Sequence, residues 1–354
     1  MMDFLGQTKG IENLLDFDDH KMVSFVFDRE SGLTGFISFH RGGLQDPCFG
    51  ATRICNYPSS KDALKDSLKL SRTMSFKSAL AGLKYGGAKA VIIANNIKPV
   101  SRNLLLQKYA QKVNYFQGKF ITGADVGTNI DDVLIMKKYS PYIVGLKVDP
   151  VAYTVLGLSF GIDVCLQEIF GTVDYPSRTF AIQGLGKVGL GILNIIANKT
   201  HKIFVADVNE KRIKEAKLKF PEIQIVPPKE IFKKNVDVLV PCALSNCINI
   251  NNINNFRCKI IAGGANCQLE NKHIGELLYK LGVLYAPDYV VNAGGIISVV
   301  YEYENRKISH DKIVENVSKI KQTLSAIINR SKKENKPTNI VADEMAQKIA
   351  DKRI

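Results

Sequence analysis

The spacing of apolar and polar residues predicts strands and one long helix in the first part of the chain. Apolar and polar residues alternate on both sides of the ESG triplet in VSFVFDRESGLTGFISFH (23–40), which predicts two strands joined by a turn. After Ser59 and Ser60, apolar residues beginning with Leu64 and Leu68 recur at helical spacing, which predicts a helix capped by a serine. The runs AKAVIIA (88–94) and GKFITGAD (118–125) predict further strands.

From about residue 179 the pattern changes to short apolar runs that are separated by helical segments. This alternation predicts βαβ units and a parallel, doubly wound sheet. After residue 306 the chain reads as helical to its end. The boundary is expected near KVDPVAYT (147–154), so the predicted fold class is α/β with two domains. The apolar runs of the second part are TFAIQ, KIFVA, IQIV, VDVLVP, KIIAGGA and VLYAPDYVV.

Length and composition agree with two domains of a soluble, cytoplasmic protein. The 354 residues exceed one ordinary core, and 45% apolar with 23% charged residues is typical of globular chains. The chain shows no run of about 18 apolar residues and no signal-peptide pattern, so no membrane association is expected. Seven scattered cysteines without a C-x-x-C pair indicate a reduced cytosol and no metal site.

The formal net charge of +14 does not by itself predict nucleic-acid binding. Basic residues are spread along the chain, and no basic stripe carries interleaved aromatic side chains. Clusters such as KEIFKK are most simply solvated helix faces. No nucleic-acid partner is therefore expected.

A glycine-rich turn in TFAIQGLGKVGLG predicts a nucleotide site. Gly184, Gly186 and Gly189 fit G-x-G-x-x-G between an apolar strand and an apolar-periodic helix, with Lys187 and Val188 inside the motif. The first glycine allows a tight turn, the second a close approach of the pyrophosphate to the helix N-terminus, and the third close packing of helix on strand. The alternative is an ordinary glycine turn of an α/β protein.

A carboxylate after the next apolar strand strengthens this prediction. Asp207 follows Gly186 by 21 residues, where it can accept hydrogen bonds from the adenosine ribose hydroxyls. Its negative charge favours NAD over NADP, because it would repel a 2′-phosphate. The nearby Lys211 and Arg212 weaken that preference slightly.

Lys89, which would be costly to bury, is a candidate catalytic residue of the first domain. In LKYGGAKAVI, Lys89 begins an apolar strand directly after Gly86 and Gly87, which would leave room for a substrate or a cofactor ring against bare backbone. Lys77 ends the preceding helix, and Asp125 ends another strand. One lysine can bind a substrate carboxylate, and a desolvated one can act as a general base. From spacing alone, a surface position for each lysine and a turn or helix-cap position for Asp125 are the favoured interpretations of each residue taken singly.

Four segments resemble motifs of the glutamate, leucine, phenylalanine and valine dehydrogenases. SFKSALAGLKYGGAKAVI (75–92) is similar to their K-x-A-x-A-G-L-x-x-G-G-A/G-K segment, and ADVGT, GGANCQL and YAPDYVVNAGGIISV follow in the family's order. The similarity extends from about residue 20 to about 305 and is greatest to leucine dehydrogenases. It implies reversible oxidative deamination of an L-amino acid by NAD, which yields a 2-oxo acid, ammonium and NADH.

The resemblance also implies an organisation of the domains. Residues 1–149 plus about 310–354 would bind substrate and build a homo-oligomer (a dimer or an octamer), and residues 150–309 would form a Rossmann NAD-binding domain. The C-terminal helices would return to the first domain, and a cleft between the domains would close for hydride transfer.

Residue roles follow from the matching positions. Lys77 would hold the substrate α-carboxylate, Lys89 would activate water as a lysine of low pKa, and Asp125 would exchange protons with the substrate nitrogen. The remaining positions would bind the substrate backbone, the nicotinamide end of the cofactor or the substrate side chain. They are, in that order, Gly50 and Asn292; Thr154 and Asn266; and Phe49, Gly123, Ile296 and Val299.

Two departures from the family pattern bear on specificity. Gly50-Ala51 stands where relatives usually have Gly-Gly, and Phe49 stands where glutamate dehydrogenases have a lysine that binds the side-chain carboxylate. An apolar ring cannot neutralise that charge, and burying the charge unpaired costs several kcal/mol, so glutamate is disfavoured. Apolar pockets separate similar apolar groups by only about 1–3 kcal/mol per methylene.

An apolar L-amino acid is therefore the predicted substrate, with leucine or another branched-chain residue first. Phenylalanine and tryptophan remain open, because Phe49 can either narrow the pocket or stack on an aromatic substrate. A catalytically inactive NAD-binding regulatory protein is the alternative of a different class. The intact set of Lys77, Lys89 and Asp125 argues against it.

Overall fold

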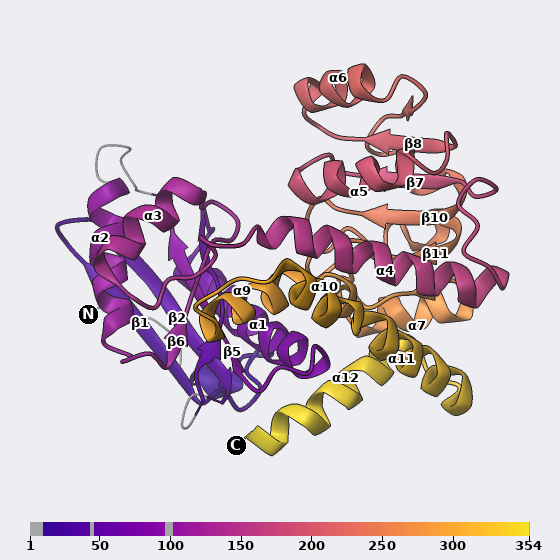
Figure 1. Ribbon diagram of the computed structural model, residues 1–354. Helices are drawn as coiled ribbons and strands as arrows, with labels where there is room; N and C mark the ends of the chain where they lie inside the picture. Colours follow the sequence, from indigo (N-terminus) through magenta and orange to yellow (C-terminus); the bar gives the residue numbers. More distant parts are fainter. Residues whose placement is uncertain (1–9, 43–45, 96–101, 354) are drawn as a thin grey trace. The chain divides into compact units, whose positions relative to one another are not determined.

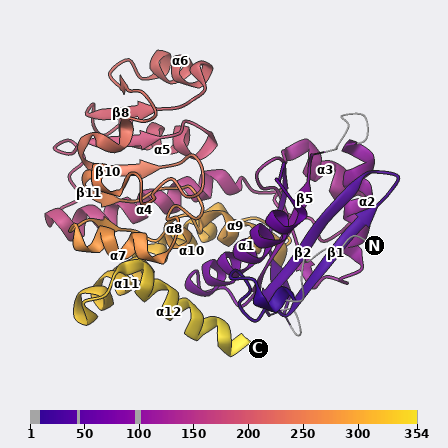
Figure 2. The same ribbon diagram turned by 180° about the vertical axis from the view of Figure 1, so that it is seen from behind.

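The computed structural model describes residues 10–42, 46–95 and 102–353 of the chain (Figures 1 and 2). The chain forms two compact units, and each contains its own sheet. The first unit comprises residues up to Val148 together with Val299–Ile308 and Ala346–Ile354. The second comprises Asp149–Ser298 and Ser309–Met345. The predicted two-domain α/β fold is confirmed.

The sheet of the first unit is mixed and has the order β1-β2-β5-β3-β6, with β4 paired to β5. Strands β1, β2 and β5 pair antiparallel, whereas β3 and β4 run parallel to β5, and β6 runs parallel to β3. The strands are β1 (Met22–Asp28), β2 (Leu33–Arg41), β3 (Cys48–Phe49), β4 (Thr52–Cys55), β5 (Gly86–Ile93) and β6 (Phe120–Ile121).

The alternation of side chains along β5 assigns its residues to two faces. Ala88, Ala90 and Ile92 belong to a buried cluster with Leu105 and Tyr109 of α2 (Arg102–Asn114). The other face meets α1 (Ser60–Leu80), since Val91 is buried with Leu64 and Leu68 of that helix. Helix α3 (Ile130–Tyr139) lies on the side of α2 (Figures 1 and 2). Lys89 shares the parity of Val91 and therefore belongs to the face that α1 covers.

The sheet of the second unit is parallel throughout, in the order β12-β11-β10-β7-β8-β9, and confirms the predicted doubly wound arrangement. Numbered within the unit, this order is 6-5-4-1-2-3, which is that of a dinucleotide-binding fold. The strands are β7 (Phe180–Gln183), β8 (Ile203–Ala206), β9 (Gln224–Ile225), β10 (Asn235–Pro241), β11 (Arg257–Ile261) and β12 (Leu284–Tyr285).

Helices surround this second sheet. Helix α4 (Pro150–Phe170) is the one described helix whose length and composition would suffice to cross a membrane, but half of its apolar stretch is buried in the fold. Its neighbours include α5, α8, α10 and α11. The other helices that follow α4 are α5 (Lys187–Ala197), α6 (Glu210–Lys219), α7 (Lys272–Lys280), α8 (Asp288–Val291), α9 (Gly294–Glu304), α10 (His310–Ser318), α11 (Ile320–Glu334) and α12 (Thr338–Ala350).

The course of the C-terminal residues differs from the predicted division into 150–309 and about 310–354. Residues 309–345 belong to the second unit because α10 and α11 bury apolar residues such as Ile313 and Leu324 while packing on α4. Residues 299–308 and 346–354 belong to the first unit. There Arg41 Nε donates a hydrogen bond to Asp351 Oδ1 at 3.1 Å.

Candidate active site

Lys89 and Asp125 form a buried ion pair in the first unit. Strand β5 directs Lys89 toward α1, and Asp125 follows β6 at a position of the same parity as Ile121, which pairs with Phe49 of β3. Lys89 Nζ lies 2.8 Å from Asp125 Oδ2, and the two side chains are 5% and 13% exposed. Two residues that the sequence singled out separately are thus in direct contact.

A third side chain, which the sequence reasoning missed, completes this cluster. Arg53 Nε donates to the same oxygen, Asp125 Oδ2, at 2.9 Å, and Arg53 Nη1 donates to Asp66 Oδ2 at 3.0 Å. Arg53 lies in β4 opposite Val91 of β5, so it points to the same face as Lys89. The signal in the sequence was an arginine within the short run TRIC (52–55), which the structure forms as β4 with Thr52 and Ile54 buried on either side.

The two cations decide the ionisation of Asp125. Burial alone would raise the pKa of its carboxyl group, because the charged form loses hydration. The charges of Lys89 and Arg53, and the hydrogen bonds that they donate, hold the pKa of Asp125 well below its ordinary value. Asp125 is therefore a carboxylate, able to accept hydrogen bonds from a cationic or neutral nitrogen.

Lys77 is buried in the last turns of α1, the helix that covers the Lys89 face. Two residues earlier in that helix, Ser75 Oγ accepts hydrogen bonds from the backbone N–H groups of Gly87 at 3.0 Å and Arg41 at 3.3 Å. This contact joins the end of α1 to the start of β5, two residues before Lys89. Lys77 and Lys89 therefore belong to the same region of the first unit.

Gly86 and Gly87 do not leave room for a ligand, contrary to the interpretation made from the sequence. A Cβ added to Gly86 would lie 1.7 Å from the Arg41 carbonyl oxygen, and one added to Gly87 would lie 2.0 Å from Ser75 N. Neighbouring backbone fills the space beside both glycines. Their physical role is to let β2 and α1 approach β5 closely.

The predicted side-chain pocket is represented in the first unit by Phe49, Gly123 and Val299. Phe49 is 1% exposed, and its ring centroid lies 4.7 Å from that of Tyr85 and 5.3 Å from that of Tyr303. Its ring is thus fixed between two tyrosines of the same unit. Gly50 would clash with the Ala88 carbonyl at 2.2 Å if it carried a Cβ, and Gly123 is buried beside Val144.

In the second unit, the glycine turn joins β7 to α5. Gly184 has a φ of +89°, which favours glycine, and a Cβ on Gly189 would lie 1.8 Å from the Gly184 carbonyl oxygen. Gly186 is the N-cap of α5, and apart from its chain neighbours no atom lies within 4 Å of an added Cβ. Open space in front of a helix N-terminus fits the pyrophosphate of a dinucleotide.

Asp207 follows β8 and stabilises this turn. Its Oδ2 accepts a hydrogen bond from Leu185 N at 2.6 Å, and its Oδ1 accepts one from Asn209 N at 2.7 Å. Arg212 Nη1 lies 3.7 Å from Oδ2. Lys187 is exposed and Val188 is half-buried at the start of α5. The predicted ribose-binding carboxylate is therefore also part of the turn.

The remaining predicted residues lie on neighbouring segments of the second unit. Asn292 Nδ2 donates to Asn266 Oδ1 at 2.9 Å, and Asn292 Oδ1 is buried without a hydrogen-bond partner among the described residues. Thr154 Oγ1 donates to the Pro150 carbonyl oxygen at 2.8 Å, and Ile296 is buried in α9. The structure thus brings Asn266 and Asn292 together and leaves one polar atom to be satisfied.

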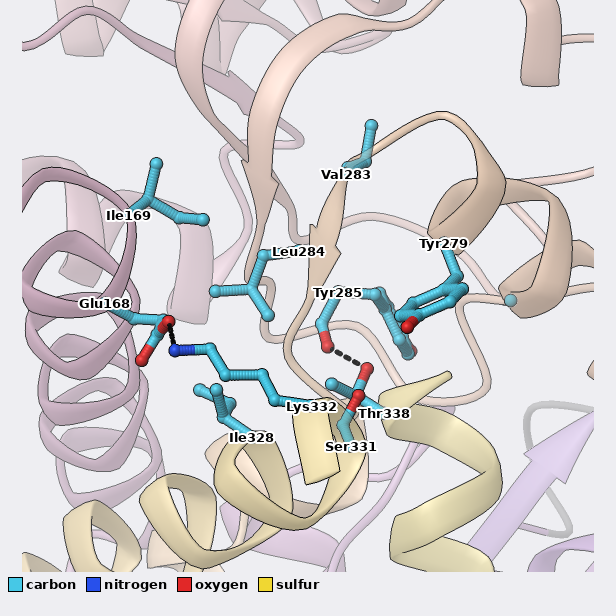
Figure 3. A pocket seen from close by; sticks show the side chains of 11 residues that line it. Glu168, Ile169, Tyr279, Val283, Leu284, Tyr285, Ile328, Ser331, Lys332 and Thr338 are labelled. Carbon is cyan, nitrogen blue, oxygen red and sulfur yellow. Dashed lines mark hydrogen bonds and ion pairs between the residues drawn. The ribbon is translucent and has the colours of Figure 1, made fainter. Parts of the chain in front are cut away.

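A separate hollow of about 120 Å³ in the second unit contains none of the predicted residues (Figure 3). An ion pair between Lys332 and Glu168 and a 2.5 Å hydrogen bond from Thr338 Oγ1 to the Tyr285 carbonyl oxygen lie within its walls (Figure 3). These polar groups already satisfy one another. Within residues 10–42, 46–95 and 102–353, no three His, Cys, Asp or Glu side chains are grouped so as to hold a metal ion.

Two family descriptions cover most of the chain. Residues 19–141 match the "Glu/Leu/Phe/Val dehydrogenase, dimerisation domain", and residues 196–352 match the "Glutamate/Leucine/Phenylalanine/Valine dehydrogenase" family. The chain belongs to the Glu/Leu/Phe/Val dehydrogenase family. The resemblance inferred from the sequence motifs is confirmed.

Individual relatives of this family are similar over nearly their whole length. Leucine dehydrogenase of Bacillus cereus is 34% identical over 348 residues, 96% of this chain and 93% of the relative. L-tryptophan dehydrogenase of Nostoc punctiforme is 37% identical over 334 residues, 93% of this chain and 92% of the relative. The crystal structure of L-tryptophan dehydrogenase from that organism aligns with a TM-score of 0.78 at 36% identity, covering 94% of this chain and 96% of the other.

Family membership settles the reaction class. The predicted enzyme, an amino acid dehydrogenase that acts on the CH–NH2 group, is confirmed. Members of the Glu/Leu/Phe/Val family depend on a pyridine nucleotide, and the open space at Gly186 beside the Asp207 carboxylate fits such a group. The dimerisation domain of the family also implies that the chain oligomerises.

Proposed function

We propose that this protein catalyses the reversible oxidative deamination of an apolar L-amino acid with NAD as the cofactor. Leucine or another branched-chain amino acid is the preferred substrate, and the products are the 2-oxo acid, ammonium and NADH. The buried pair of Lys89 and Asp125, joined by Arg53, carries this proposal. A lysine and a carboxylate 2.8 Å apart can pass a proton between a water molecule and a substrate nitrogen.

The residues of the first unit divide the chemistry between them. Lys77 binds the substrate α-carboxylate as a point charge. When bound, the cofactor accepts a hydride from the substrate Cα. Lys89 takes a proton from the water that attacks this carbon, and Asp125 exchanges protons with the nitrogen that leaves as ammonium. One water molecule is consumed, and one proton is released besides ammonium, so the deamination is balanced.

An apolar substrate is supported by the surroundings of Phe49. Its ring is enclosed by Tyr85 and Tyr303, and the Tyr85 hydroxyl donates to Glu304 at 2.7 Å. The cation beside these groups, Lys84, already has a carboxylate partner, since its Nζ lies 3.9 Å from Glu304 Oε1, so glutamate is disfavoured. The aromatic alternative is supported by the similarity to L-tryptophan dehydrogenase, since aromatic walls also accept an aromatic ring.

NAD is proposed over NADP because of Asp207. Its carboxylate, held by Leu185 N and Asn209 N after β8, would repel a 2′-phosphate and accept hydrogen bonds from ribose hydroxyls. Arg212 lies beside this carboxylate, so Asp207 compensates part of the positive charge of Arg212 that could otherwise attract a 2′-phosphate. A preference for NADP in steady-state kinetics would contradict the assignment.

A homo-oligomer, dimer or octamer, is proposed to form through the first unit. Strand β1 is at the edge of its sheet, and Phe25 and Phe27 on it are 51% and 52% exposed and stack on each other. An edge strand that carries exposed aromatic rings favours pairing with another chain. A molar mass of 39.2 kDa by light scattering, that of one chain, would contradict this proposal.

A substrate panel tests the function directly. NADH formation is measured with leucine, valine, phenylalanine, tryptophan and glutamate under identical conditions. We expect the highest kcat/KM with leucine or another branched-chain amino acid, and the lowest with glutamate. A maximum with phenylalanine or tryptophan would support the aromatic alternative instead. Confirmed NAD binding without turnover of any amino acid would refute the enzyme function and favour a regulatory role.

A further inference from the structure

Arg53 is held between two carboxylates next to the proposed proton-transfer pair. Its Nε contacts Asp125 and its Nη1 contacts Asp66, which also accepts a 2.6 Å hydrogen bond from the Tyr57 hydroxyl. The Arg53 side chain is 11% exposed. A buried guanidinium with carboxylate partners at two of its three nitrogens is held in position, so it loses little further conformational freedom when substrate binds.

Both cations in contact with Asp125 use the same oxygen. Lys89 Nζ and Arg53 Nε lie 2.8 and 2.9 Å from Oδ2. This arrangement fixes the carboxylate through one atom and leaves Oδ1 to meet a substrate nitrogen. It also means that Asp125 never depends on Lys89 alone for its orientation.

The two cations differ in chemistry. The proposed reaction requires Lys89 to bind and release a proton, and when it is neutral it can no longer balance the Asp125 charge. A guanidinium stays protonated throughout the range in which proteins are folded. Arg53 therefore supplies a positive charge that does not vary during the reaction, while Lys89 supplies one that does.

We propose that Arg53 is a positioning residue that keeps Asp125 ionised and oriented while Lys89 gains and loses its proton. The role rests on the proposed function, since it presumes proton transfer at Lys89. Asp66 completes the arrangement because it compensates the second charge of the buried cluster. Two cations, Lys89 and Arg53, then face two anions, Asp125 and Asp66.

The groups that affect Asp125 come from several elements. Lys89 of β5 and Arg53 of β4 contact it directly, and Asp66 of α1 acts through Arg53. Cys55 of β4 is close enough for Asp125 and Arg53 to influence its thiol, whose pKa is raised mainly by burial. Among the residues that the structure describes, removing Arg53 leaves Lys89 as the only cation in contact with Asp125, which must shift the pH at which the site becomes active.

The test compares Arg53→Met, Arg53→Lys and a control, Arg72→Met. Arg72 also belongs to the first unit and pairs with a carboxylate, Asp18 Oδ2, at 2.8 Å, but it does not contact Asp125. We expect Arg53→Met to lower kcat at least about 100-fold, with a smaller change in amino acid KM. We expect the acid limb of its kcat profile to move up by about one pH unit. Arg53→Lys should recover part of kcat, and Arg72→Met should keep kcat near that of the wild type.

Two kinetic results would overturn the inference. The first is an Arg53→Met enzyme with the kcat and pH profile of the wild type. The second is a loss of kcat with an unshifted acid limb and no recovery in Arg53→Lys, which would indicate a merely structural role. Wild-type turnover in the same assay tests the proposed function separately.

A measurement without turnover tests the contact between Arg53 and Asp125, on which the inference rests, even if the wild type turns over no amino acid. Thermal unfolding of Arg53→Met, Asp125→Asn and the double variant measures the coupling of the two side chains. We expect the double variant to lose less in Tm than the two single losses added together. Fully additive losses would overturn the inference whatever the substrate panel shows.

Discussion

The substitution Gly186→Ala separates a binding role of the glycine turn from a packing role. Gly186 has φ −68° and ψ −170°, a backbone conformation that any residue adopts. An added Cβ meets no atom within 4 Å beyond its chain neighbours. A Gly→Ala substitution restricts the unfolded chain and so raises the free energy of unfolding by about 0.4–1 kcal/mol. Alanine is also a poorer N-cap than glycine, which lowers the free energy of unfolding by a similar amount. We expect the free energy of unfolding to change by less than about 1 kcal/mol.

Cofactor binding should respond very differently to the same methyl group. If the pyrophosphate approaches the backbone at Gly186, the added Cβ occupies its place. We expect the NADH Kd to rise at least about tenfold, equivalent to about 1.4 kcal/mol. Because the chain has no tryptophan, NADH fluorescence can be titrated without a tryptophan background, and calorimetry provides a second reading. An unchanged NADH Kd in a folded Gly186→Ala protein would refute the assignment of this turn.

Gly87→Ala is the matched control, because there the steric conflict lies within the protein. Its Cβ would lie 2.0 Å from Ser75 N, so β5 and α1 must move apart. Overpacking of this kind costs about 1–3 kcal/mol or more, and we expect a lower Tm. NADH affinity should be nearly unchanged, since the glycine turn lies in the other unit. A Tm equal to that of the wild type would refute the close-approach explanation.

Two further outcomes follow from buried ionisable groups of the first unit. Lys89→Ala should abolish turnover in the steady-state assay while NADH Kd changes little; a near-normal rate would refute its role. Burial is the main cause that lowers the pKa of His20 to about 4, below the ordinary histidine value of 6.5. The resulting stability is present above pH 6.5 and lost as the pH falls toward 4, up to about 3 kcal/mol by linkage. His20→Gln should flatten urea-unfolding free energies between these pH values, and an unchanged slope would contradict this assignment.

The neutral state of His20 is also visible in its hydrogen bonds. Its Nδ1 accepts from Asp18 N at 3.1 Å, and its Nε2 donates to the Leu68 carbonyl oxygen at 3.0 Å. Only the neutral ring can accept at one nitrogen and donate at the other. Protonation would break the contact with Asp18 N, so the loss of stability at low pH has a defined structural origin.

Features encoded in short stretches could be predicted from the sequence. The turn from Gly184 to Gly189 depends on neighbouring residues of one βα unit, and Asp207 lies at the end of the next strand. The alternation of short apolar runs and helices likewise predicted the parallel sheet of the second unit. In each case the physical cause is a backbone conformation or a buried strand, and the residues that indicate it lie within about thirty positions of one another.

Features that depend on distant packing could not be predicted in the same way. The assignment of residues 309–345 to the second unit depends on the apolar surface that α4 offers to α10 and α11. The purpose of Gly86 and Gly87 depends on where Arg41 and Ser75 come to lie. The backbone at Gly86 and Gly87, which the sequence suggested was open to a ligand, is covered by other backbone, because only the fold determines which neighbours approach.

The missing arginine shows the same limit at the site itself. Lysines 77 and 89 with one carboxylate gave an unbalanced set of charges, and burying such a set is costly. Charge balance alone implies a further anion, which is Asp66, but it does not imply another cation. Only the parallel register of β4 on β5 places Arg53 beside Asp125, 72 residues away, and joins it to Asp66. The lysine that opened the question is therefore accommodated by a group of four charges. Its burial is explained by partners from strand β4, the segment after β6 and helix α1, and a change at any of them should alter the ionisation or orientation of Asp125.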